Sequence, residues 1–281
     1  MANLFSGLEA FGLGNLSEMD VYEEKDKDIA ATSVDKDKAA FQEEDIIFDK
    51  TFACPVCDQE FKTKQVKSGK VKLLNLDPDL RPVYQFIDPL KYDAIVCPSC
   101  GFSALSRFFK YVTGAQAQLI KKNISANFKG INETGSFFTY DDALARHKLA
   151  LVSAIVKRSK TSERAYTCLK IAWILRGKSE SLPEDTPDYK NKLAELEKEE
   201  LDFISKAYVG FDEAFSTETF PLCGMDESTM TLLMAELSRR IGKYDEASRW
   251  ISRVLISKEA SERIKEKARD IKDMIKDNKN Y

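Results

Sequence analysis

The stretches Cys54-Pro55-Val56-Cys57 and Cys97-Pro98-Ser99-Cys100 decide the fold of this chain. Two thiols separated by two residues can bind one metal ion from a single tight turn, here called a knuckle. A second knuckle completes a tetrahedron of four sulfur atoms around the same ion. The predicted metal ligands are Cys54, Cys57, Cys97 and Cys100.

The predicted metal is a structural Zn²⁺. A module of about 60 residues buries too little surface to be stable alone, and structural zinc supplies roughly 10–16 kcal/mol of apparent binding energy in small peptides near neutral pH. A catalytic zinc needs an open coordination position, whereas four thiolates fill the shell. Sulfur spacing alone does not distinguish zinc from iron, so a rubredoxin-like iron site for electron transfer is an alternative.

Composition and charge are typical of a soluble globular protein. The chain has 281 residues, of which 32% are charged and 43% hydrophobic, enough for two modest domains. Its net charge of −3 is too small to indicate nucleic acid or a membrane as a partner. No apolar run approaches the roughly 18 residues of a spanning helix, and the N-terminus has no secretory signal pattern. We expect a cytoplasmic protein, with Cys168 and Cys223 as free thiols.

Residues 1–45 are expected to be an acidic, largely disordered leader. Residues 1–53 contain 13 Asp/Glu and 5 Lys, a net charge of −8. Such a segment buries too little apolar surface to offset the entropy lost on ordering. Apolar side chains between Leu4 and Met19 fit either a docking peptide for a partner or a segment that folds back on its own domain.

Residues 46–112 are expected to form a small β module that looks like a zinc ribbon. The expected elements are a strand at 46–48, a hairpin with strands at 61–66 and 71–76, a last strand at 92–96, and a helix at 103–109. Asp58 and Gly101 follow the two knuckles directly. Both positions favour a left-handed backbone, which Gly adopts freely and Asp tolerates better than most residues.

Residues 113–281 are expected to be α-helical and tetratricopeptide-like, which makes the fold class α+β, mostly α. The expected helices span about 115–127, 139–157, 161–177, 188–215, 233–255 as a helix pair, and 264–275. In the pair, the first helix ends on Gly242, and the small Ala247 lets the second helix pack closely. Because such arrays are mostly binding scaffolds, we expect a protein or peptide partner; a plain helical core without a ligand groove is the alternative.

The sequence shows no catalytic constellation. The single histidine, His147, is expected on a helix edge in a structural role. Cys168 lies in an apolar helix stripe and is interpreted as a core residue. Cys223 is expected in a loop without a neighbouring histidine or basic cluster to lower its pKa. We therefore favour a non-enzymatic protein, while enzymatic activity stays open.

Lysines on the predicted hairpin support a second function, nucleic-acid binding. They are Lys62, Lys64, Lys67, Lys70 and Lys72, and Phe61 and Tyr84 lie near them in the sequence as possible stacking residues. Four thiolates and Zn²⁺ together add about −2, which offsets most of the module's positive charge. A solvated strand face is therefore the preferred interpretation.

The order of these parts resembles a bacterial family catalogued as domain of unknown function 2225. The resemblance rests on the two knuckles, on Asp88-Pro89-Leu90-x-Tyr92-Asp93 between them, and on the helices that follow. It spans roughly residues 46–277, and only Asp58 departs from the glycine usual after a knuckle. The resemblance implies a cytoplasmic bacterial protein without an established activity.

Taken together, these features favour a non-enzymatic, zinc-stabilised scaffold or adaptor that binds a protein or peptide through its helices. Binding to nucleic acid through the hairpin lysines is the first alternative, and a rubredoxin-like iron module is the second. Binding that weakens steeply as salt is added would favour the nucleic-acid alternative. A purified protein that contains iron and absorbs visible light would favour the rubredoxin-like one.

Overall fold

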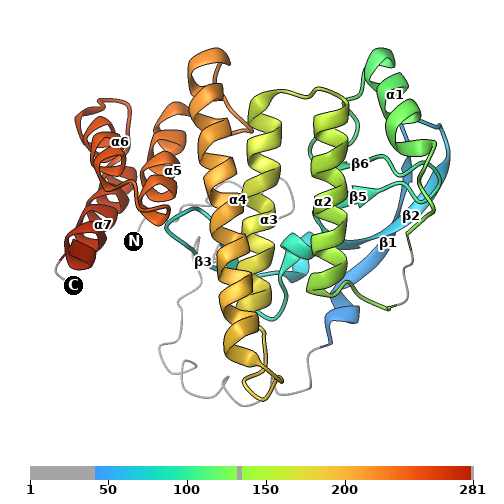
Figure 1. The fold of residues 1–281 in the computed structure, drawn as a ribbon, viewed down its shortest axis with the longest axis horizontal. Helices are drawn as coiled ribbons and strands as arrows, with labels where there is room; N and C mark the ends of the chain where they lie inside the picture. Colours follow the sequence, from blue (N-terminus) through green and yellow to red (C-terminus); the bar gives the residue numbers. More distant parts are fainter. Residues whose placement is uncertain (1–41, 132–134, 280–281) are drawn as a thin grey trace, which may run out of the picture. The chain divides into compact units, whose positions relative to one another are not determined.

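The computed structural model of the protein describes residues 42–131 and 135–279 (Figure 1). Most of the predicted leader, residues 1–45, lies outside the described residues, and so does its docking segment. Its last residues are described and are ordered, because a helical turn begins at Glu43 and this side chain pairs with Lys91 over 2.7 Å. Gln42–Tyr281 make one compact unit, and the boundary expected between residues 112 and 113 stays a prediction. The predicted class, α+β and mostly α, is confirmed, because short strand pairs come first and long helices follow.

The strands form three separate antiparallel pairs. They are β1 (Ile47–Ala53) with β2 (Glu60–Val66), β3 (Leu73–Leu76) with β4 (Pro82–Tyr84), and β5 (Ala94–Val96) with β6 (Ser103–Leu105). Four short helical turns flank them: η3 (Glu43–Ile46), η4 (Ser68–Lys70), η5 (Pro89–Tyr92) and η6 (Lys121–Ser125). The first and the third pair each have a knuckle as the turn of the hairpin.

Two sequence expectations in this region were wrong. The strand at 61–66 was expected to pair with 71–76, but β2 pairs with β1, with Phe52 opposite Phe61. The segment 103–109 was expected to be a helix, but its first residues form β6, with Ile95 opposite Ala104. The reason is the same in both cases. Each knuckle reverses the chain within six residues, so the segments on either side of it pair with each other.

Seven α-helices occur in the described part of the chain. They are α1 (Gly114–Ile120), α2 (Tyr140–Val156), α3 (Thr161–Glu180), α4 (Tyr189–Thr217), α5 (Glu227–Arg240), α6 (Tyr244–Ile256) and α7 (Glu262–Lys279). Helix α2 begins as expected, because Thr139 and Asp142 form a reciprocal capping box. Helix α3 continues past its expected end at Gly177, where a Cβ atom would lie 2.7 Å from the Tyr140 ring. Glycine there permits close packing rather than ending the helix.

Helix α3 is the centre of the core and lies between α2 and α4 (Figure 1). Leu169 and Ile174 of α3 are fully buried, together with Phe211 of α4 and Leu233 of α5. On the other side of α2, Ala150 packs against the β5–β6 hairpin. A second apolar cluster holds α5, α6 and α7 together. The tetratricopeptide likeness of these helices stays a prediction.

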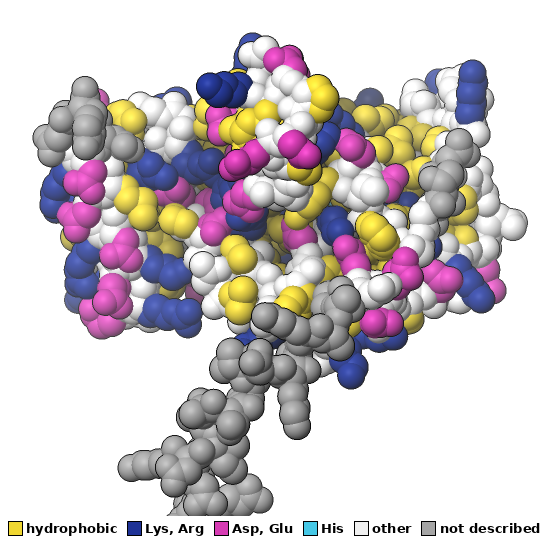
Figure 2. Space-filling view, turned by 90° about the horizontal axis from the view of Figure 1, so that it is seen from below, with side chains coloured by type: hydrophobic (Ala, Val, Ile, Leu, Met, Phe, Trp, Pro, Cys, Tyr) yellow, Lys and Arg dark blue, Asp and Glu magenta, His cyan; other side chains and the backbone are white. Residues whose placement is uncertain are grey.

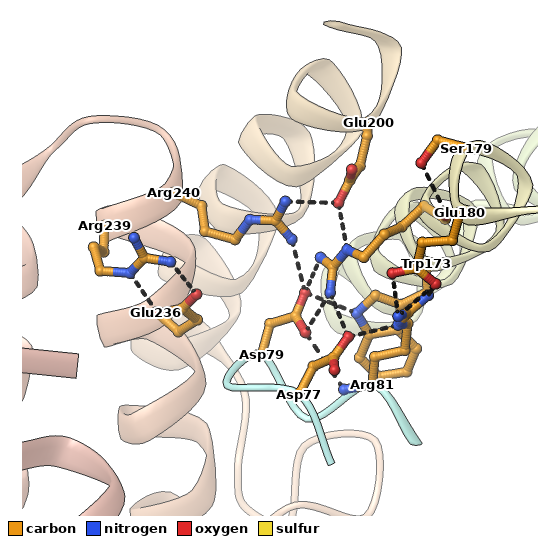
Figure 3. A network of polar contacts seen from close by, with 11 residues as sticks. Asp77, Asp79, Arg81, Trp173, Ser179, Glu180, Glu200, Glu236, Arg239 and Arg240 are labelled. Atoms are coloured by element: carbon orange, nitrogen blue, oxygen red, sulfur yellow. Dashed lines mark hydrogen bonds and ion pairs between the residues drawn. The ribbon is translucent and has the colours of Figure 1, made fainter. Parts of the chain in front are cut away.

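The loop between β3 and β4 inserts two carboxylates among the helices. Figure 3 shows Asp77 and Asp79 of this loop directed toward arginine side chains of the helical region. Arg176 of α3 lies 2.9 Å from Asp77 Oδ2 through Nη1 and 2.5 Å from Asp79 Oδ2 through Nη2. Its Nε lies 2.8 Å from Glu200 of α4. This network connects the strand region to α3 and α4 through polar contacts that are largely shielded from water.

Candidate metal centre

The two knuckles share one backbone pattern. In the first, Cys54 N donates to Gln59 O over 3.0 Å and Asp58 N donates to Cys54 O over 2.9 Å. In the second, Cys97 N donates to Phe102 O over 2.9 Å and Gly101 N donates to Cys97 O over 3.0 Å. Each knuckle is therefore a hydrogen-bonded turn that holds its two thiols on the same side.

The residue after each knuckle has the left-handed conformation expected from the sequence. Asp58 has φ 59° and Gly101 has φ 74°. At Gly101 a side chain is also excluded sterically, because a Cβ atom would lie 2.6 Å from Cγ of Phe128. The two positions share a left-handed backbone, but only the position of Asp58 has room for a side chain.

The four predicted ligands come together as one cluster. All four Sγ atoms lie within 4.8 Å of one another. Between the knuckles, Sγ of Cys54 lies 3.6 Å from that of Cys100, and Sγ of Cys57 lies 3.7 Å from that of Cys97. A tetrahedral zinc ion with Zn–S bonds of about 2.3 Å requires sulfur atoms about 3.8 Å apart. The geometry of the cluster therefore fits a metal ion bound by four thiolates, while the element itself is not determined by it.

The cluster lies in an apolar environment. Cys54, Cys97 and Cys100 are buried and Cys57 is half-buried. The phenyl rings of Phe52 and Phe61 stack with centroids 6.2 Å apart, and Phe109 packs against both. This wall reduces access of water to the sulfur atoms, as expected at a structural metal site rather than at an open catalytic one.

Hydrogen bonding within the cluster separates the acidities of its thiols. Hydrogen bonds with the Cys100 and Cys54 thiols lower the pKa of Cys97. Hydrogen bonds with Cys54 and Cys97, together with burial, raise the pKa of Cys100. The arrangement favours the thiolate form of Cys97, and the thiolate is the form that binds a metal.

Helical segments hold the second knuckle from outside. Ser153 Oγ of α2 accepts a hydrogen bond from Ser103 N over 3.1 Å. Ser125 Oγ, in η6, donates to Cys100 O over 2.8 Å. No local sequence pattern predicts these two serines, because their partners lie 50 and 25 residues away along the chain.

The other candidate residues are not part of this cluster. His147 is completely buried, with Nδ1 2.7 Å from Ala143 O, and burial lowers its pKa to about 4. Cys168 is buried in the helical core, as expected. Cys223 lies in a loop and its Sγ donates to Ser162 O over 3.3 Å. Among the described residues, no second group of His, Cys, Asp and Glu side chains is close enough to hold a metal ion.

The lysines considered for nucleic acid do not form an uninterrupted basic surface. In the β1–β2 pair, Lys64 lies opposite Asp49, and Glu60 begins the strand that carries Lys62. Lys67 Nζ donates to Asp45 O over 3.0 Å. Figure 2 shows basic, acidic and apolar side chains intermixed over the face that it displays. Such a surface resembles an ordinary solvated one.

None of the helices in the described ranges is both long and apolar enough to cross a membrane.

Comparison with known proteins gave a single kind of match. A family model with the description "Uncharacterized protein conserved in bacteria" matches residues 47–275, which include both knuckles and nearly all of the described helices. The comparisons with curated proteins and with solved structures found no match.

Proposed function

Because this chain belongs to the bacterial family DUF2225, whose description names no activity, we propose its function from the structure itself. It is a non-enzymatic scaffold that one Zn²⁺ stabilises and that binds a protein or peptide partner through its helices.

The buried four-thiol cluster supports a structural role for the metal. It joins two hairpins that are not hydrogen-bonded into one sheet, and four sulfur atoms leave no coordination position for a substrate. Metal binding can then supply folding energy to a region whose two-stranded sheets are only marginally stable alone. None of the six cysteines forms a disulfide, which fits a reducing cytoplasm as the site of action.

A groove between α4 and α6 supports partner binding. Its volume is about 480 Å³, and Tyr208, Val209 and Trp250 line it together with charged side chains. Val209 is 59% exposed, and Trp250, which lines the same groove, is partly exposed. Tryptophan, tyrosine and arginine are the residues that carry most binding energy at protein interfaces.

The groove is ordered before any partner arrives. The Trp250 ring packs on Phe215 with centroids 5.3 Å apart, and its Nε1 donates to Tyr208 Oη over 3.3 Å. Arg253 lies over the Phe215 ring at 4.5 Å. Side chains fixed in this way lose little entropy on binding.

The proposal is tested by affinity capture from a bacterial extract with the full chain. A Val209→Asp variant should lose a captured protein that the wild type retains at raised salt, because a buried charge opposes an apolar contact. Val152→Asp is the matched control, since Val152 is also a helical valine and is 48% exposed. The proposal would be contradicted if the chain captured only nucleic acid and this binding weakened steeply as salt was added. It would also be contradicted if the purified protein contained iron.

A further inference from the structure

A second cavity, between α3 and α4, has a chemical character different from that of the partner groove. Its volume is about 450 Å³, within the range of small-molecule sites. We propose that this cavity binds a small molecule carrying an oxyanion, a carboxylate or a phosphate, through Arg164 and Lys206. The proposal goes beyond the scaffold function and does not depend on it.

Arg164 has donor capacity that the described residues do not use. Its Nη2 donates to Thr161 Oγ1 over 3.0 Å. Its Nε is buried and has no hydrogen-bond partner. Among the described residues, the only other buried side-chain nitrogen or oxygen without a partner is Nε2 of His147. By contrast, every guanidinium nitrogen of Arg176 lies within 2.9 Å of a carboxylate. A buried N–H without an acceptor costs free energy. Because this atom has almost no accessible surface, an oxyanion in the cavity satisfies it once the Arg164 side chain turns toward the cavity.

Lys206 provides a second positive charge without a partner. It lines the same cavity and forms no ion pair within the described ranges. Arg164, Lys206 and Cys168 all line this one cavity. The single acidic residue of the lining, Glu213, accepts a hydrogen bond from Thr161 Oγ1 over 3.2 Å. The lining therefore carries two positive charges, on Arg164 and Lys206, and one negative charge, on Glu213.

The remaining lining defines the size and character of the ligand. Thr161 and Ser205 contribute hydroxyl groups, while Ala165 and Val209 contribute apolar surface. The two helices approach closely at Gly210, where a Cβ atom would lie 2.9 Å from Cβ of Ala165. The first turn of α3, which begins at Thr161, adds the positive end of a long helix dipole. A compact acid with a short apolar portion fits this lining.

The cavity is suited to binding rather than to covalent chemistry. Burial raises the pKa of Cys168 to about 11, although Lys206 and Arg164 act in the opposite direction. The sulfur is therefore a thiol near neutral pH and a poor nucleophile. We assign the site no reaction.

The test observes the Arg164 guanidinium directly. The Nε–H resonance of Arg164 is identified in ¹⁵N-labelled full-length protein by its loss in Arg164→Lys, and inorganic phosphate or succinate is added at constant ionic strength. We expect a saturable shift of this resonance with at least one of the two probes. The preference between them shows whether the natural ligand is a phosphate or a carboxylate.

Two variants separate a specific site from general attraction to positive charge. Lys206→Gln, a change at an exposed residue, should weaken binding about tenfold, because a charged hydrogen-bond partner is lost. Arg249→Gln removes an exposed cation outside this cavity and should leave the affinity unchanged. The proposal is overturned if the Arg164 resonance does not saturate with either probe, or if Arg249→Gln weakens binding as much as Lys206→Gln does.

Discussion

Asp79 and Arg240 form an ion pair across 161 residues of the chain, with Arg240 Nη1 3.3 Å from Asp79 Oδ2. The same carboxylate accepts a hydrogen bond from Trp173 Nε1 over 3.1 Å, besides its pairing with Arg176. One buried side chain of the β3–β4 loop is thus bonded to both α3 and α5 (Figure 3). The loop fixes these helices relative to each other, so the strand region contributes to the stability of the helical one.

Asp79→Asn should destabilise the whole unit. The substitution leaves Arg176 and Arg240 with one carboxylate fewer in a site where Asp79 is 1% exposed. Removing one member of a buried ion pair costs about 3–5 kcal/mol, and the lower end is expected because Arg176 keeps Asp77 and Glu200 as partners. Chemical denaturation followed by circular dichroism measures the change.

Asp273→Asn is the control for this prediction. Asp273 pairs with Lys276 over 2.6 Å, but both side chains are exposed. Surface pairs contribute little because water and salt screen them, so no measurable change is expected. Equal effects of the two substitutions would show that the buried network is not what joins the loop to the helices.

The sequence predicted best those features that depend on neighbouring residues. The knuckles, the left-handed Asp58 and Gly101, and the capped start of α2 all follow from short local patterns. The pairing expected between 61–66 and 71–76 was wrong, because the first knuckle, and not the short segment between those two strands, turns the chain so that β2 pairs with β1. No role was predicted for the carboxylates of the β3–β4 loop. Arg81 is only four residues from its partner Asp77, but Arg176 and Arg240 lie 97 and 161 residues from Asp79, too far along the chain for a local pattern to relate them.

His147 should make stability depend on pH. Burial lowers its folded-state pKa to about 4, below the ordinary value of 6.5. The unfolded state therefore binds a proton more readily, and stability that is complete above about pH 6.5 is lost as the pH falls toward 4. The loss amounts to about 3 kcal/mol at 1.36 kcal/mol per pKa unit. Because the chain has one histidine, its imidazole resonance reports the titration without ambiguity, and a value near 6.5 would contradict the prediction.

Gly101→Ala and Asp58→Gly should have opposite effects. At Gly101 an alanine would combine a left-handed backbone, which costs roughly 1–2 kcal/mol, with a contact 2.6 Å from Phe128. The expected results are a lower melting temperature and weaker retention of metal against a chelator. At Asp58, with φ 59°, glycine removes the strain and should be neutral or slightly stabilising. Equal destabilisation by both changes would mean that the knuckles do not control the fold of the hairpins.

Cys97→Ser should release the metal and disorder the two knuckle hairpins while leaving most of the helical signal. Cys97 is fully buried within the thiol cluster, and a hydroxyl is a poor replacement for a thiolate ligand. The core around α3 and the α5–α7 cluster contain none of the four cysteines. Elemental analysis measures the metal per chain, and circular dichroism measures the helices. Cys168→Ser, also a change at a buried cysteine, should keep one equivalent of metal. If Cys97→Ser keeps it as well, the four sulfur atoms are not the ligands and the metal must be sought elsewhere.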